Sequence, residues 1–437
     1  MHGLQQQQYC DDDISLKIPL IIADQNPQAA GGGLQQTSGN SSGNGGGAAT
    51  FLKTCFNGLN ALAGVGILSV PYALASGGWL SLALLFAIAA VAFYSGLLMQ
   101  RCMDKNSNIK TYPDIGELAF GKIGRLVVST SMYTELYLVS IGFLILEGDN
   151  LSNLFPIMEI QVAGLAIGGK QFFVVVAALV ILPTMWLDNL SLLSYVSASG
   201  VFASAIIIFS ISWTATFDGV GFHEKGTLIS WNGIPTAVSL YAFCYCAHPV
   251  FPTLYNSMRK KHQFSNVLLV CFLFTTAGYA SMGIIGYLMF GSKVESQVTL
   301  NLPLNKISSK IAIYTTLVNP ITKYALMTTP ITNALKDLLP RKYKNRVTNI
   351  SISTMLVIST VIIALAVPFF GYLMSLVGAI LSVTASILLP CLCYLKISGK
   401  YKNFGCEMFT IVAIILAAIA MGISGTYTSL LEIIHHL

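Results

Sequence analysis

The feature that most constrains the fold of this chain is a long apolar segment interrupted by glycines and a proline. It covers about residues 51–76, which is long enough to cross a bilayer, since a spanning helix needs about 20 residues. Gly64, Gly66 and Pro71 fall in its middle, where glycine favours non-helical backbone and proline lacks a hydrogen-bond donor. Unwound backbone at bilayer depth is tolerated only where protein buries it or where it lines a cavity. The two half-helix ends would then offer free N–H and C=O groups to a zwitterion or an ion, which predicts a transporter.

Composition places the rest of the chain in a membrane as well. Hydrophobic residues make up 54% of the sequence and charged residues 10%, whereas soluble globular proteins carry about 25% charged residues. Apolar runs of spanning length recur along the chain and are separated by short loops, and we predict eleven membrane-spanning helices. They cover residues 51–76, 78–101, 125–147, 171–187, 191–213, 234–256, 266–290, 309–335, 347–367, 370–395 and 407–433.

The distribution of basic residues predicts the orientation. With a cytosolic N-terminus, 18 of the 24 Lys and Arg residues lie on the cytosolic side, as the positive-inside rule requires. An odd number of spans then places the C-terminus on the lumenal or extracellular side. This topology accounts for the net charge of +6, so the predicted partner is the lipid bilayer and no nucleic-acid partner is expected.

Residues 1–50 differ from the rest of the chain. They are rich in Gln, Gly, Asn and Ser, and such a segment cannot bury enough apolar surface to fold. We therefore predict a disordered cytosolic tail over residues 1–50 and a transporter domain over residues 51–437.

A second interruption falls in the sixth predicted span, which contains Pro249 and Pro252. The first span enters from the cytosol, and the sixth enters from the outside five spans later. Two interrupted helices at corresponding places of two opposed halves indicate an inverted repeat with its binding site at the midplane. The repeats would cover residues 51–213 and 234–395, with residues 407–433 as an additional span.

The residues at these interruptions resemble the amino acid/auxin permease family. The matching patterns are Asn60-x-x-x-Gly64-x-Gly66-Ile67-Leu68-Ser69-x-Pro71-Tyr72-Ala73 in the first span and Phe243-x-x-x-Ala247-His248-Pro249-x-x-Pro252-x-Leu254-Tyr255 in the sixth. Similarity to its plant and yeast vacuolar amino acid transporter branch comes from Gly148-Asp149-Asn150 and Asn319-Pro320-x-x-Lys323-Tyr324. The resemblance covers about residues 50–435. It implies an all-α integral membrane protein of the leucine-transporter type, with eleven helices and proton-driven movement of amino acids.

An amino acid substrate is expected to bind at the two breaks. Backbone amides that begin the second half of the first span would receive its carboxylate at a positive helix-dipole end. Carbonyl groups at the end of the first half, and in the sixth span, would receive its ammonium group. The predicted substrate-binding residues are Asn60, Ala63, Gly64, Val65, Gly66, Ile67, Tyr133, Phe243, Tyr245 and Cys246.

Two of these residues have alternative roles. Asn60 either holds the break of the first span together or touches the substrate. Tyr133, in the third span, either closes over the substrate through its hydroxyl or packs between helices.

Ion coupling is assigned to charged and hydroxyl side chains within the spans. Glu135 and Lys323 lie deep in the third and eighth spans, where charged groups are costly and usually functional or paired. We expect them to face a common polar interior and to pair. Thr328 and Thr329 could contribute hydroxyls to a sodium site, but the Lys323 ammonium group could replace the sodium ion, which favours protons over sodium.

His248 is a further candidate for proton coupling, because histidine titrates near neutral pH. It precedes Pro249, so its ring could instead satisfy the carbonyl groups that the proline kink frees. This structural role is the favoured one.

The sequence contains no phosphate-binding or hydrolase motif and no paired His or Cys ligands at metal spacing. No cofactor, metal site or enzymatic activity is therefore predicted. The expected function is proton-coupled antiport of mainly neutral amino acids across the vacuolar membrane. The alternatives are a plasma-membrane amino acid or auxin symporter, and a membrane receptor that binds amino acids without moving them.

Overall fold

The computed structural model describes residues 49–162, 165–186, 190–340, 345–400 and 405–436. The predicted disordered tail therefore lies outside the described residues except at its end. There, Ala49 is buried and pairs with the chain that follows the sixth predicted span. Its N–H donates to the Ser257 carbonyl and its own carbonyl accepts from the Arg259 N–H, both at 3.0 Å. The folded domain thus includes Ala49, which the sequence had assigned to the tail.

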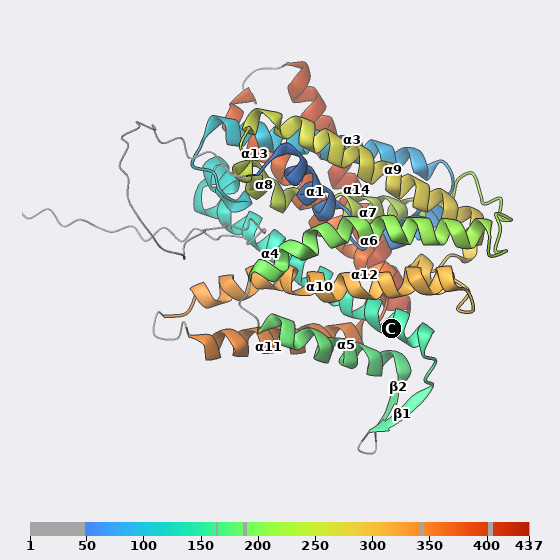
Figure 1. Ribbon diagram of the computed structural model, residues 1–437. Coiled ribbons are helices and arrows are strands. Elements are labelled where there is room, and N and C mark those ends of the chain that lie inside the picture. The colour runs from blue at the N-terminus through green and yellow to red at the C-terminus, as the bar shows by residue number, and fades with distance from the viewer. Residues whose placement is uncertain (1–48, 163–164, 187–189, 341–344, 401–404, 437) are drawn as a thin grey trace, which may run out of the picture.

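The described chain is built mainly of helices that run side by side (Figure 1). They are α1 (Phe51–Leu62), α2 (Gly66–Gly77), α3 (Ser81–Lys105), α4 (Tyr112–Leu154), α5 (Gly169–Met185), α6 (Leu190–Thr216), α7 (Ile234–Cys244), α8 (Phe251–Ser257), α9 (Phe264–Phe290), α10 (Ile307–Asp337), α11 (Arg346–Ala366), α12 (Phe370–Val377), α13 (Leu389–Ser398) and α14 (Cys406–His436). Each predicted span coincides with one of these helices or with two consecutive ones.

Length and hydropathy identify fewer membrane spans than the sequence predicted. Within the described residues, seven helical segments are long and apolar enough to cross a membrane, or eight if the bent pair α1–α2 is one span. Helix α5 and the described end of α6 are apolar but shorter, whereas α10 has 31 residues and includes Asn319, Lys323 and several threonines. The protein is a multi-pass membrane protein, and the count of eleven spans stays a prediction.

The predicted interruption of the first span is present. Helices α1 and α2 differ in direction by 52°, and residues 63–65 connect them. The interruption involves the glycines and not Pro71, which lies inside α2. Helix α2 continues through Pro71 and packs closely on α9, where a methyl group added to Gly286 would lie 2.6 Å from the Pro71 side chain.

The second interruption is also present, and it lies next to the first. Helix α7 ends at Cys244, and α8 begins at Phe251 after a short 3-10 turn, η2 (His248–Val250). Pro249 and Pro252 lie in the first turns of η2 and α8, where a missing N–H breaks no helix hydrogen bond. Helix α2 packs against both α7 and α9, which brings the two broken helices together.

Three local features were not anticipated. A hairpin of β1 (Glu159–Val162) and β2 (Leu165–Gly168), paired antiparallel with Glu159 opposite Gly168, extends from the helices between α4 and α5 (Figure 1). Helix α4 begins at Tyr112, ahead of the predicted span, and is kinked at Gly121, whose φ is +66°. Residues 378–388, between α12 and α13, are largely π-helical.

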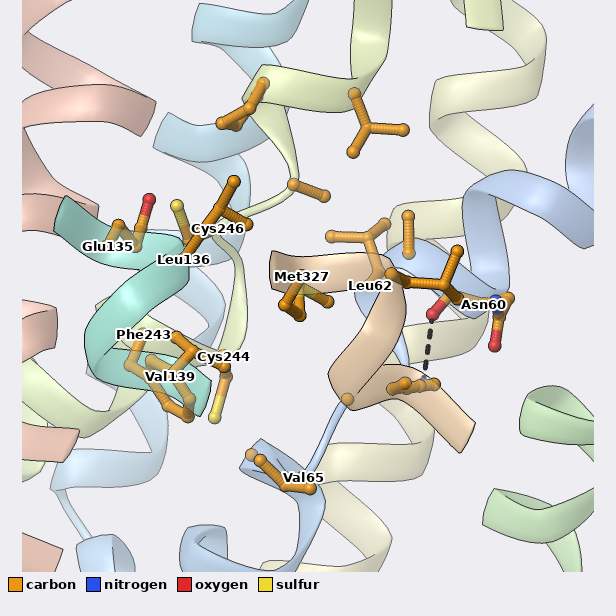
Figure 2. A pocket seen from close by; sticks show the side chains of 18 of the residues that line it. Asn60, Leu62, Val65, Glu135, Leu136, Val139, Phe243, Cys244, Cys246 and Met327 are labelled. Carbon is orange, nitrogen blue, oxygen red and sulfur yellow. Dashed lines mark hydrogen bonds between the residues drawn. The ribbon is translucent and has the colours of Figure 1, made fainter. Parts of the chain in front are cut away.

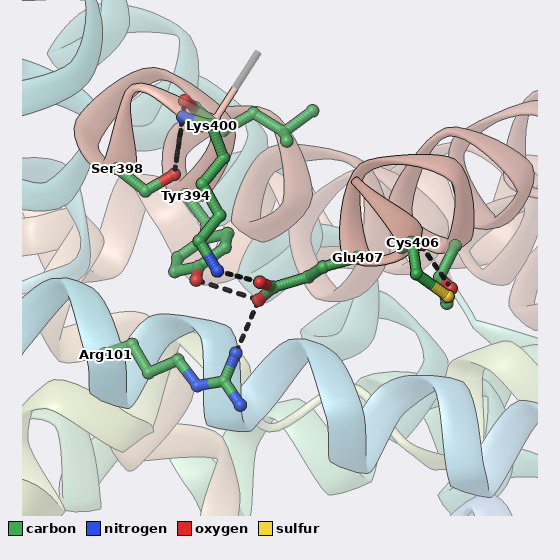
Figure 3. Close-up of polar contacts among 8 residues, drawn as sticks. Arg101, Tyr394, Ser398, Lys400, Cys406 and Glu407 are labelled. Carbon is green, nitrogen blue, oxygen red and sulfur yellow. Dashed lines mark hydrogen bonds and ion pairs between the residues drawn. The ribbon is translucent and has the colours of Figure 1, made fainter. Parts of the chain in front are cut away.

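The additional helix α14 lies at the edge of the bundle, and only 11% of its most apolar 18-residue stretch is buried. A polar cluster fixes its beginning (Figure 3). The Glu407 carboxylate accepts hydrogen bonds from Arg101 of α3 at 2.7 Å and from the Tyr394 hydroxyl of α13 at 2.9 Å, and it also pairs with Lys400. These contacts connect the beginning of α14 to α3 and α13.

Candidate functional site

A cavity of about 180 Å³ lies where the two broken helices meet. Figure 2 shows Glu135 and Cys246 on one side of it and Asn60 on the other. Its lining residues come from α1, the break, α2, α4, α7, the chain around η2, α9 and α10. They are Asn57, Asn60, Ala61, Leu62, Gly64, Val65, Gly66, Met132, Glu135, Leu136, Val139, Phe143, Phe243, Cys244, Cys246, Ala247, Pro249, Val250, Tyr279, Lys323, Leu326, Met327 and Pro330.

The beginning of α2 offers hydrogen-bond donors to this cavity. Among the described backbone groups, the N–H groups of Val65 and Gly66 donate to no carbonyl oxygen, because the first turn of a helix leaves its amides free. A methyl group added to Gly64 would meet no atom within 4 Å, so the space beside it is open. A methyl group added to Gly66 would lie 2.8 Å from Cys244 Sγ. The glycine at position 66 therefore lets α2 approach α7.

One hydroxyl connects both breaks. Tyr279, on α9, is buried, and its hydroxyl lies 2.5 Å from the Leu62 carbonyl oxygen and 3.2 Å from the Cys244 carbonyl oxygen. These carbonyl groups belong to the last residues of α1 and α7, where helix carbonyls lack an internal partner. Tyr279 thus holds the two half-helices at a fixed separation across one wall of the cavity.

The Lys323 side chain reaches the same break from α10. Its ammonium group donates to the Ala63 carbonyl at 3.0 Å and lies 3.5 Å from the Asn60 carbonyl oxygen. Lys323 is 3% exposed, so its charge is withdrawn from solvent and stabilised by the negative end of the α1 dipole. A methyl group at Gly200 of α6 would lie 3.4 Å from Lys323 Cε and would collide with Asn60 Oδ1. Gly200 therefore makes room for both side chains.

Glu135 does not pair with Lys323, contrary to the sequence-based expectation. Within the described residues no ion pair joins them. Glu135 instead accepts a hydrogen bond of 2.6 Å from Ser382 Oγ in the π-helical segment, and the Cys246 side chain lies beside it (Figure 2). Both charged groups line one cavity, as predicted, but each has a different partner.

The predicted residues divide into two groups. The cavity lining includes Asn60, Gly64, Val65, Gly66, Phe243, Cys246, Glu135 and Lys323. It does not include Ala63, Ile67, Tyr133, Tyr245, His248, Thr328 or Thr329. Ala63 contributes through its carbonyl group, which binds Lys323.

Three of the excluded side chains make structural contacts, whereas the Tyr133 hydroxyl is buried without a hydrogen-bond partner among the described residues. The Tyr245 hydroxyl donates to Thr276 Oγ1 at 2.9 Å, and its ring stacks on Phe272 of α9. Thr328 and Thr329 donate to carbonyl groups one turn back on their own helix, which directs both hydroxyls toward the α10 backbone. Neither hydroxyl therefore lies with the α1 carbonyl groups that Lys323 binds. A sodium site shared by these hydroxyls and those carbonyl groups is not formed in this structure.

His248 has a structural role, but not the predicted one of satisfying carbonyl groups that the proline kink frees. It is fully buried, and its Nε2 lies 3.1 Å from the Ala92 carbonyl oxygen and 2.9 Å from Ser95 Oγ, both on α3. Because a carbonyl oxygen can only accept, Nε2 carries the proton toward Ala92. The ring therefore connects the break of the sixth span to α3, outside the cavity.

Asn60 has a buried acceptor without a partner, and this acceptor lies against Gly200 of α6. Its Oδ1 is buried and has no hydrogen-bond partner among the described residues, although its residue lines the cavity. Such orphan acceptors are costly unless something binds them.

Sequence reasoning missed Tyr279 altogether, since a tyrosine in an apolar span carries no signal of the direction in which it points.

Comparison with known proteins shows the family to which the whole domain belongs. The sequence model of the family described as transmembrane amino acid transporter protein matches residues 47–430. The chain belongs to that family. The transporter is 61% identical over 388 residues to amino acid transporter AVT1I of Arabidopsis thaliana, covering 89% of this chain and 96% of that one. It is 58% identical to AVT1J of the same plant, covering 88% of this chain and 91% of the relative. The transporter is therefore a non-enzymatic carrier of amino acids.

Solved structures show the same fold at low identity. The transporter matches MhsT in complex with L-phenylalanine with a TM-score of 0.53 and 12% identity, over 87% of this chain and all of MhsT. It matches a Na⁺-coupled sialic acid symporter with the same TM-score and identity, over 86% of this chain and 88% of the symporter. These matches identify the leucine-transporter-type fold.

Proposed function

We propose that this transporter exchanges protons for neutral amino acids across the vacuolar membrane and binds them in the cavity between the two breaks. The position of Lys323 carries the proposal. Its ammonium group lies on the carbonyl groups that end α1, where a cation is favoured by the helix dipole. A group that can lose a proton therefore occupies a place that a metal cation would otherwise fill.

The cavity suits a small zwitterion with an uncharged side chain. A carboxylate would accept from the free N–H groups of Val65 and Gly66, and an ammonium group would donate to carbonyl groups between Phe243 and Cys246, which line the cavity at the end of α7. Val139 and Phe243 contribute apolar surface for the side chain. The volume of about 180 Å³ exceeds the roughly 150 Å³ that accommodates benzene. It is therefore large enough for a medium-sized neutral amino acid.

Proton exchange would act through the end of α1. When Lys323 is protonated, it holds the Ala63 carbonyl and stabilises the present arrangement of the break. Loss of that proton would remove the cation and leave these carbonyl groups free, which favours a different position of α1. Glu135 is a second group in the same cavity that could carry a proton. The resemblance to the vacuolar branch supports the location, where lumenal acidity would supply the gradient.

The test is uptake of labelled neutral amino acids into proteoliposomes with an acidic interior and no sodium. We expect accumulation that collapses when a protonophore is added. Uptake that requires sodium, or binding without flux, would contradict the proposal. Fluorescence localisation of the tagged full-length protein tests the vacuolar assignment separately, because plasma-membrane labelling would indicate the symporter alternative.

A further inference from the structure

A second and larger cavity lies between α6 and the beginning of α10, away from the site described above. Its volume is about 830 Å³. Helices α6 and α10 pack side by side (Figure 1), and the cavity opens where α6 ends and α10 starts. The transport site uses none of its lining residues.

The long wall of this cavity is apolar and aromatic. Phe202, Ile206, Phe209 and Trp213 contribute side chains from α6, and Phe202 and Phe209 are 60% and 65% exposed. Phe202 and Trp213 are eleven positions apart, so the wall is about 16 Å long at 1.5 Å per residue. One leaflet of a bilayer has a hydrocarbon depth of about 15 Å, half of the roughly 30 Å core. The wall therefore matches the length of one leaflet.

The opposite end of the cavity is polar and carries both signs of charge. Asp218, after α6, accepts a hydrogen bond from Ser308 Oγ, and Ser308 also contacts Thr214 Oγ1 at 2.9 Å. Lys306, just before α10, also lines the cavity. Its Nζ makes no hydrogen bond or ion pair with the part of the chain that the structure describes. An anionic and a cationic group thus face one space at the end of an apolar wall.

We propose that this cavity binds a zwitterionic phospholipid with a primary ammonium headgroup, that is, a phosphatidylethanolamine. Its phosphate would accept from Lys306, its ammonium group would donate to Asp218, and one acyl chain would lie along α6. A purely anionic headgroup satisfies Lys306 but is repelled by Asp218. A choline headgroup carries the right charges but has no N–H to donate. The order of affinity follows as ethanolamine, then choline, then the anionic glycerol headgroup.

Trp213 provides a direct readout, because bromine on an acyl chain quenches a nearby indole. The full-length protein and its Trp213→Phe variant are reconstituted with small mole fractions of brominated lipid, and the difference between them isolates Trp213. We expect brominated phosphatidylethanolamine to quench this component at about one third of the mole fraction that brominated phosphatidylglycerol needs. Equal quenching by brominated phosphatidylethanolamine, phosphatidylcholine and phosphatidylglycerol would mean that Trp213 contacts ordinary surrounding lipid, and it would overturn the proposal.

Two charge variants test the assigned contact. Asp218→Asn should remove the difference between ethanolamine and glycerol headgroups, because Lys306 binds the phosphate of both lipids and only Asp218 distinguishes them. Lys310→Gln, which changes an exposed lysine one turn further along α10 that does not line the cavity, should leave it intact. Loss of the preference in both variants, or in neither, would contradict the site. Monodisperse elution and retained amino acid binding establish that each variant is folded.

Discussion

The Tyr279 hydroxyl donates a hydrogen bond of 2.5 Å to the carbonyl oxygen of Leu62, the last residue of α1. The same hydroxyl lies 3.2 Å from the Cys244 carbonyl oxygen at the end of α7. A hydroxyl has one proton, so it can satisfy only one of these two acceptors fully at a time. Any movement of α1 relative to α7 therefore changes at least one of the two contacts of this hydroxyl.

Tyr279→Phe should slow transport by about tenfold while leaving the protein folded. The change leaves the Cys244 carbonyl group without a donor, whereas the Leu62 carbonyl keeps the Gly64 N–H at 2.8 Å. The loss of a donor to a buried carbonyl group costs about 1–3 kcal/mol. A change of about 1.4 kcal/mol in a barrier corresponds to a factor of ten in rate. Initial uptake rates in proteoliposomes measure this effect.

Tyr287→Phe is the matched control on the same helix. Its hydroxyl accepts from the Thr227 N–H at 2.8 Å, in the loop before α7 and outside the cavity. We expect its uptake rate to remain within about twofold of wild type. Equal losses in both variants would mean that Tyr279 acts only by stabilising α9.

Lys323→Met should abolish accumulation driven by a pH gradient. The variant keeps most of the side-chain volume but removes the ammonium group that holds the Ala63 carbonyl. Exchange of labelled for unlabelled amino acid, which needs no net proton movement, should persist. The control is Lys336→Met, which changes a lysine near the end of α10. Accumulation by Lys323→Met at the wild-type level under a pH gradient would refute the coupling role of Lys323.

Alanine at the two glycines of the break should act differently. Gly66→Ala places a methyl group against Cys244 Sγ, so it should separate α2 from α7 and reduce folded yield as well as transport. A Gly66→Ala/Cys244→Ala double variant should recover part of both. Gly64→Ala meets no neighbour within 4 Å. We expect it to preserve thermal stability and to raise KM, because its methyl group occupies cavity space.

Val139→Ala should shift substrate preference toward larger neutral amino acids. Val139 lines the cavity from α4 (Figure 2), and its shortening enlarges the apolar part. One methylene group more or less in an apolar pocket changes the preference between two substrates by about 10-fold or more. Competition of phenylalanine against alanine for uptake measures the shift, and an unchanged ratio would place the substrate side chain elsewhere.

Glu407→Gln should have little effect on uptake, in contrast to the cavity variants. The Glu407 cluster joins α14 to α3 and α13, but the Arg101 and Glu407 side chains are 48% and 26% exposed. Ion pairs at such positions contribute about 0–1 kcal/mol. A fall in melting temperature of no more than a few degrees, with normal uptake, is the expected result; loss of transport would give α14 a functional role.

The local elements were largely predictable. Each predicted span coincides with a helix or a helix pair, because uninterrupted apolar length is a property of the sequence itself. The break at Gly64 was equally local, since glycine weakens a helix wherever it lies. Pro71 was misjudged as part of that break. The loss of one N–H near the beginning of α2 is tolerated where α9 packs tightly against the proline.

The composition of the site was predicted only in part. Lys323 and Glu135 were identified because a charge within an apolar span is conspicuous. Their pairing was wrong, since the sequence gives depth along a helix but not the direction around its axis. For the same reason Tyr245 was expected in the cavity and Tyr279 was not.

The sequence by itself determined the membrane environment, the helical segments and the positions of both breaks, because these depend on apolar length and on glycine and proline chemistry. The tertiary structure decided which side chains line the cavity and which carbonyl groups Lys323 and Tyr279 hold. A helix that is apolar on nearly every face has no pattern that fixes its rotation. That rotation is set by close packing against neighbouring helices, and packing exists only in the folded protein.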